Sequence, residues 1–207
     1  MNRLIYIADP MCSWCHGFTP TITKLAQHYQ AQLSFSIIMG GLRPGGHTPW
    51  DQKMKDFLRH HWEEVASKTG QPFTYDLLER DHFKYDTEPS CRAVCVVRDM
   101  APAKTFVFFK AIQYAFYFLN NDPNELDFYW PICEELDIDV TEFTTKFKSD
   151  AYRERTKLDF THSRQLGVKG FPTLLMIKGE EVHVVSPGFA EFDQLQERID
   201  GLLKPIF

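Results

Sequence analysis

Two cysteines near the start of the chain, Cys12 and Cys15, have a spacing that suits redox chemistry. They are three residues apart, nearly one helical turn, so their sulfurs can come within disulfide-bonding distance. A dithiol that closes and opens without large backbone movement can pass two electrons to or from another disulfide. The same C-x-x-C pattern also forms half of many zinc sites, so the spacing alone leaves both chemistries open.

The segments on either side predict that this pair lies at the start of a helix. Residues 4–8 form a short apolar run that Asp9-Pro10 ends, which is typical of a buried strand. A helix N-terminus stabilises a thiolate, so we expect Cys12 to have a lowered pKa and to attack disulfides. Cys15, directed inward, is expected to resolve the intermediate. After the pair, apolar residues recur at the three- and four-residue spacing of a helix: Phe18, Ile22, Leu25, Ala26 and Tyr29.

The rest of the chain predicts an α/β domain interrupted by a block of helices. A second strand is expected at 33–39, then, late in the chain, a hairpin of strands 173–177 and 182–186 and a final helix over 192–203. We therefore predict a sheet domain of residues 1–41 plus 166–207, with a helical insertion domain of residues 42–165. Helices within the insertion are expected at 49–69, with Thr48 as N-cap, and at 90–100, 102–119, 123–136, 140–148 and 151–165, the fourth interrupted by Pro131.

Two motifs resemble those of a known family. Residues 12–20, from Cys12 to Pro20, resemble the active-site helix of thioredoxin-family proteins, and residues 167–173 are similar to the loop in which that family carries a cis-proline, here Pro172. With the helical block and Asp9-Pro10, the chain resembles the DsbA-like branch, particularly its FrnE-like members. This resemblance implies a thioredoxin fold with a large all-helical insertion between its β-α-β and β-β-α halves.

The resemblance also implies an activity, that of a thiol:disulfide oxidoreductase or protein disulfide isomerase. Its redox centre would be Cys12 and Cys15, and Pro172 would line the substrate groove beside them. The strongly oxidising members carry a histidine where this chain has Trp14, so their redox potential does not transfer. Whether the protein oxidises, reduces or isomerises disulfides is left open.

Other residues around the motifs are candidates for supporting roles. Ser13, Trp14 and Phe171 are expected to contact the substrate. Asp9 and His16 are candidates for proton transfer, although Asp-Pro is also a common turn opener and His16 can equally be a solvated helix residue.

The three remaining cysteines are expected to be packing residues. Cys91 and Cys95 share one face of a predicted helix among small apolar residues, and Cys133 follows Ile132. A zinc site built from the first four cysteines is an alternative, but its wide spacing is unlike that of compact zinc ribbons, and we expect no bound metal. Residues 40–46 lack a phosphate-loop ending and predict a flexible connection.

Composition narrows the class of partner. The net charge of −5, with no basic stripe, argues against nucleic acid or an anionic membrane surface. The early start of the first strand leaves no room for a secretory signal, and five unevenly spaced cysteines fit a reducing compartment, so we expect a cytoplasmic protein.

The expected substrates are cysteine-containing proteins or peptides, with glutathione as a candidate co-substrate and no cofactor beyond the redox disulfide. Two other functions stay open: a glutathione-dependent kappa-like transferase or isomerase, and a chaperone-like binding module with an idle cysteine pair.

Overall fold

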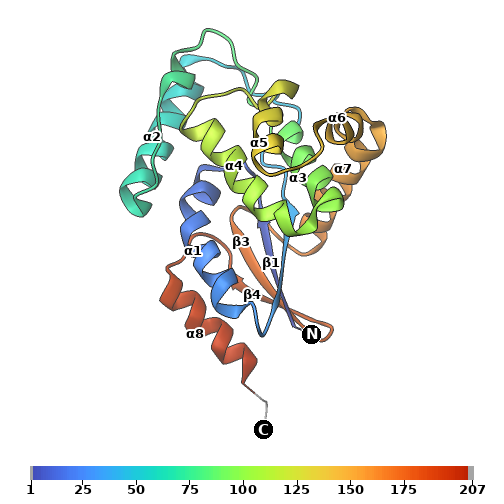
Figure 1. Cartoon of the computed structure of the whole chain (residues 1–207). Coiled ribbons are helices and arrows are strands. Elements are labelled where there is room, and N and C mark those ends of the chain that lie inside the picture. Colours follow the sequence, from blue (N-terminus) through green and yellow to red (C-terminus); the bar gives the residue numbers. More distant parts are fainter. Residues whose placement is uncertain (1, 205–207) are drawn as a thin grey trace.

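The computed structural model describes residues 2–204, which fold around one four-stranded sheet with the order β2-β1-β3-β4. The two N-terminal strands are parallel, whereas β3 is antiparallel to both β1 and β4. The strands are β1 (Arg3–Ala8), β2 (Ser34–Met39), β3 (Thr173–Lys178) and β4 (Glu181–Ser186). The structure thus has the predicted mixed α/β thioredoxin fold, in which strands from both ends of the chain form a single sheet (Figure 1).

Two helices complete the predicted β-α-β and β-β-α halves, and six more lie between them in the sequence. α1 (Ser13–Tyr29) connects β1 to β2, and α8 (Phe192–Leu203) packs beside it (Figure 1). The intervening helices are α2 (Gln52–Thr69), α3 (Glu88–Met100), α4 (Thr105–Tyr117), α5 (Trp130–Glu135), α6 (Val140–Lys148) and α7 (Asp150–Gln165), with short 3₁₀ turns at Asp76–Glu79, Pro102–Lys104 and Leu126–Tyr129.

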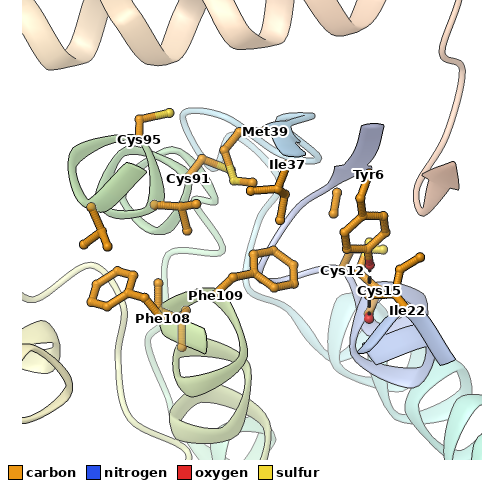
Figure 2. Packing of buried hydrophobic residues seen from close by; sticks show 14 of the residues in the cluster. Tyr6, Cys12, Cys15, Ile22, Ile37, Met39, Cys91, Cys95, Phe108 and Phe109 are labelled. Carbon is orange, nitrogen blue, oxygen red and sulfur yellow. Dashed lines mark hydrogen bonds between the residues drawn. The ribbon is translucent and has the colours of Figure 1, made fainter. Parts of the chain in front are cut away.

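One hydrophobic core joins the sheet to the helical block. In β1, Leu4, Tyr6 and Ala8 face the cluster that also holds residues of α1, α3 and α4, whereas Ile5 and Ile7 face the opposite side of the sheet, as the two-residue period of a strand requires. Figure 2 shows Tyr6 of this cluster with residues of α3 and α4. The domain boundaries at residues 42 and 165 stay a prediction.

Three predicted helix starts are wrong by three residues or more. One is that of α4, which begins at Thr105 because Pro102–Lys104 form a 3₁₀ turn. α2 begins three residues later than expected because Asp51, and not Thr48, is its N-cap: the Asp51 carboxylate accepts a hydrogen bond from Met54 N at 2.9 Å. The expected helix over residues 123–136 is a 3₁₀ turn followed by the short α5. Pro131 lies in the first turn of α5, where its missing N–H costs nothing, so this proline begins a helix rather than bending one.

The connection over residues 40–46 is also more constrained than its glycines suggest. A methyl group at Gly40 would overlap the Phe171 ring, and Gly41, with φ of +73°, packs against Phe160. At these two residues the absence of a side chain permits close packing, and the flexibility of the link stays a prediction. In the described part of the chain, no helix combines the length and the apolar character that crossing a membrane requires.

Candidate redox site

Cys12 and Cys15 lie where the sequence predicts, at the start of α1. Cys12 is the N-cap residue, with extended backbone angles, and its carbonyl accepts the hydrogen bond of His16 N at 3.0 Å. The main chain of the preceding turn is fixed by Cys12 N, which donates to Asp9 O at 3.1 Å. Both cysteines are free thiols. The Cys12 sulfur thus lies at the positive end of the helix dipole, a position that favours an anionic group.

The environments of the two sulfurs are unequal. Cys12 is 5% exposed, whereas Cys15, close to it in Figure 2, is 0% exposed. Burial raises the pKa of the Cys15 thiol well above its ordinary value, and the hydrogen bond and negative charge of Cys12 raise it further. Cys15 is therefore held as a thiol that an outside disulfide cannot reach directly.

The Pro172 loop lies against Cys12, although 159 residues separate the two segments. Cys12 Sγ donates to the Phe171 carbonyl oxygen at 3.6 Å. The Phe171–Pro172 peptide bond is cis, the isomer that the resemblance implies. The loop is closed by Thr173 Oγ1, which donates to Gly170 O at 2.8 Å. The fold thus brings the two sequence motifs into direct contact.

Two cavities that share Trp14 and Phe171 in their walls lie near the start of α1. The larger, of about 650 Å³, lies between α1, α2 and the loops before β3 and α8. The smaller, of about 150 Å³, is lined by Cys12 itself. Trp14 and Phe171 line both cavities, Pro172 the larger and Ser13 the smaller, so three of the four residues predicted to contact substrate border the cavity that Cys12 lines.

The sequence did not reveal the other walls of these cavities. Phe189, whose ring packs 5.8 Å from that of Trp14, and Glu64 and Lys68 of α2 line the larger one. Arg43 and His61 line the smaller one. In the sequence, Arg43 and Phe189 are loop residues, and the other three are helix positions outside the apolar pattern. No local pattern marks any of them, and only the fold brings them to the cavities.

Asp9 is a buried carboxylate with several donors. It is 0% exposed, and accepts hydrogen bonds from Met11 N at 2.9 Å, Leu42 N at 2.7 Å and Cys91 Sγ at 3.4 Å. Burial raises its pKa, while these donors oppose the shift. The negative charge of Asp9 also raises the pKa of Cys15. Asp9 thus joins the cysteine turn to the insertion, and its role in proton transfer stays a prediction.

His16 contacts the insertion rather than solvent. Its ring stacks on Tyr117 with centroids 4.8 Å apart and meets Phe73 edge-on at 5.0 Å, while Nε2 lies 3.1 Å from Pro72 O. Nδ1 is buried without a partner among the described residues. Burial lowers the pKa of His16 to about 4. These contacts favour a packing role for a neutral imidazole.

We predict a pH-dependent stability that arises from His16. An unfolded chain protonates this residue below about pH 6.5, whereas the folded protein does so only near pH 4, so the unfolded state is favoured as pH falls through this window. Between about pH 7 and about pH 5 the loss should be about 2 kcal/mol. Urea unfolding at both pH values should show this loss in the wild type and not in His16→Gln. An equal pH dependence in both proteins would contradict the assignment.

The other cysteines lie away from the redox pair's cavities and make local contacts. Cys91 donates to Asp9, and Cys95 Sγ donates to Asp159 Oδ2 at 3.6 Å. Burial raises the pKa of Cys95 and of Cys133 to about 12. Within residues 2–204, no group of three or more His, Cys, Asp or Glu side chains has the arrangement of a metal site.

Comparison with known proteins agrees with this geometry. The chain is 39% identical to a candidate protein disulfide isomerase from Nitrosomonas europaea, with a TM-score of 0.91 over 98% of this chain and 97% of that one. It is 25% identical to the cytosolic disulfide reductase DsbM from Pseudomonas aeruginosa, with a TM-score of 0.79 over 97% and 98% of the two chains.

A more distant relative is the ClpXP adapter protein SpxH of Halalkalibacterium halodurans, 21% identical over 172 residues. That alignment covers 81% of this chain but only 56% of the adapter, so the chain spans little more than half of this curated relative. The FrnE-like branch stays a prediction. Residues 4–200 match the family described as the DSBA-like thioredoxin domain, nearly the whole chain. The chain therefore belongs to the DSBA-like thioredoxin domain family.

Proposed function

We propose that this protein is a thiol:disulfide oxidoreductase in which Cys12 attacks and Cys15 resolves. The observation that carries the proposal is the unequal pair at the start of α1. Cys12 borders the smaller cavity and contacts the Pro172 loop, whereas Cys15 is fully buried. Only the sulfur that a substrate can reach can form the first bond, so the geometry supports this order of events.

The proposed cycle needs no bound cofactor because the disulfide itself stores the electrons. Reducing a substrate begins when Cys12 thiolate attacks one sulfur of its disulfide, and the other sulfur leaves as a thiolate that takes up a proton. Cys15 then loses its proton to solvent and attacks the Cys12 sulfur. The bond between Cys12 and the substrate breaks, the second substrate thiolate leaves, and the protein ends as the Cys12–Cys15 disulfide. Oxidation of a substrate is the reverse sequence.

Substrates of this cycle are cysteine-containing proteins or peptides. Trp14 and Phe189 give the larger cavity an aromatic side, and Glu64 and Lys68 give it a charged one, which suits an extended peptide with a mixed sequence. One solved form of DsbM, 26% identical to this chain, is a complex with glutathione. This similarity supports glutathione as the co-substrate and a role in the cytoplasm.

The two solved relatives favour different directions, a reductase and an isomerase. The standard potential of the Cys12–Cys15 couple separates them, measured by equilibrating the protein with glutathione buffers. A value near about −270 mV favours reduction, one near about −180 mV isomerisation, and one near about −120 mV oxidation.

The attacking and resolving roles are tested by trapping. In Cys15→Ser, attack on a peptide disulfide should stop at a mixed disulfide with Cys12, because the resolving thiol is missing. Intact mass spectrometry of the variant should show one added peptide that dithiothreitol removes. Cys12→Ser is the matched control and should remain unmodified. Adducts in Cys12→Ser alone would reverse the roles, and adducts in neither variant would refute the proposed function.

A further inference from the structure

The Tyr6 hydroxyl is buried beside Cys15 and makes only a long, weak hydrogen bond. Among the described residues its one partner is the main-chain oxygen of Cys15, at 3.4 Å (Figure 2). Hydrogen bonds between two oxygens are ordinarily 2.5–3.0 Å long. Three other buried tyrosines have a much shorter bond: Tyr29 to Asp200 at 2.6 Å, Tyr85 to Met11 O at 2.7 Å and Tyr129 to Pro123 O at 2.6 Å. The Tyr117 hydroxyl, also buried, has no partner among the described residues.

A second hydroxyl approaches the same acceptor. Thr19 Oγ1 lies 3.0 Å from the Cys15 oxygen and 2.6 Å from Gln113 Oε1. The Tyr6 ring itself lies among aromatic side chains. A phenylalanine ring would fill the same space equally well and would not bury a hydroxyl. Those neighbours are Phe18, Phe35, Phe106 and Phe109, with ring centroids 6.0–6.5 Å away. Packing therefore explains the ring of Tyr6 but not its hydroxyl.

We propose that the Tyr6 hydroxyl donates a hydrogen bond to the thiolate that forms at Cys15 whenever the Cys12–Cys15 disulfide opens. This inference rests on the proposed function. Opening the disulfide creates a charge at a sulfur that is 0% exposed and cannot be solvated by water, so it requires a donor from within the protein. A hydroxyl with only a weak bond loses little when it turns toward that sulfur.

The groups that face Cys15 agree with this role. They are Tyr6 from β1, Cys12 from the start of α1, and Asp9 from the turn between them. The Cys12 side chain and the charge of Asp9 raise the pKa of Cys15, so neither side chain favours its thiolate, whereas a main-chain hydrogen bond from Asp9 lowers that pKa. Burial and the two cysteines raise the pKa of Tyr6, which keeps the phenol protonated as a donor. Among these three side chains, Tyr6 is the one that can favour a thiolate at Cys15.

The electrons balance in either direction of the cycle. When a substrate thiol loses its proton and attacks the oxidised protein, a bond forms between the substrate sulfur and Cys12 Sγ. The Cys12–Cys15 bond breaks, and its electron pair goes to Cys15 Sγ. The Tyr6 hydroxyl holds this thiolate by a hydrogen bond until solvent returns a proton. In the reverse direction the same bond favours the thiolate form of Cys15 that resolves the mixed disulfide.

The test separates attack by Cys12 from resolution by Cys15. Reduced protein is mixed with the chromogenic disulfide dithiobis-nitrobenzoate in a stopped-flow instrument. Attack by Cys12 releases one coloured thiolate at a rate that depends on reagent concentration, and resolution by Cys15 releases a second at a rate that does not. Tyr6→Phe should slow the second phase about tenfold, the effect of losing one charge-assisted hydrogen bond, and leave the first unchanged. The pH midpoint of the second phase should rise by about one unit.

Tyr29→Phe is the matched control, because it removes another buried hydroxyl whose bond goes to Asp200, away from the cysteines. Both of its phases should match the wild type. A second phase in Tyr6→Phe with wild-type rate and pH midpoint would overturn the inference, as would equal slowing of both phases. Failure of the proposed function is distinguishable: the wild type itself would then show no second phase that Cys15→Ser abolishes.

Discussion

Cys12→Ser is expected to lower the rate of disulfide exchange more than about a thousandfold, because it removes the nucleophile. Replacing both Cys91 and Cys95 by serine is expected to leave the rate within about twofold of wild type. Reduction of insulin by each folded variant, with glutathione as the electron donor, measures both effects.

The two expected rates differ because a substrate disulfide can reach the sulfur of Cys12 but not those of Cys91 and Cys95. Cys12 borders the smaller cavity, whereas Cys91 and Cys95 are both 0% exposed and donate to the carboxylates of Asp9 and Asp159. Burial and a nearby carboxylate raise the pKa of each of these two thiols, which keeps them protonated and unreactive. A tenfold loss of exchange in the folded double variant would instead make them part of the redox machinery.

The sequence predicts those features that depend on residues close together in the chain, and it misses those that depend on competing local signals or on distant segments. The bounds of α6 and α8 agree with prediction because apolar periodicity is a local pattern. The start of α2 was missed because two capping residues, Thr48 and Asp51, compete within one turn. The short α5 was missed because the sequence does not show whether Pro131 interrupts a helix or begins one.

The candidate site divides in the same way. Cys12, Cys15 and Pro172 were predicted because each belongs to a motif with fixed spacing. Lys68 of α2 and Phe189 border the site only because the fold brings their segments to it. Tyr6 is the clearest case, since in the sequence it is one residue of an apolar strand, and only the structure places its hydroxyl at Cys15.

Asp9→Ala is expected to lower the free energy of unfolding by about 4 kcal/mol, which is a large part of the stability of a typical domain. The carboxylate accepts from two buried main-chain N–H groups, those of Met11 and Leu42, and from Cys91 Sγ. Without it these donors lose their acceptor in a place that water does not reach, at about 1–3 kcal/mol for each strong donor. Urea unfolding near neutral pH, followed by circular dichroism, measures the loss.

Asp9→Asn separates the hydrogen bonds from the charge. Burial raises the pKa of Asp9, so the fold loses stability as pH rises from the ordinary pKa of an aspartate through the raised one, and a neutral amide avoids this cost. Asparagine also keeps one acceptor oxygen, so we expect it to lose about half as much stability as alanine, about 2 kcal/mol. Equal losses in both variants would mean that the charge, and not the number of acceptors, holds the turn. An asparagine variant as stable as the wild type but slow in the resolving step would instead assign Asp9 to proton transfer at Cys15, because only the titrating oxygen would then be missing.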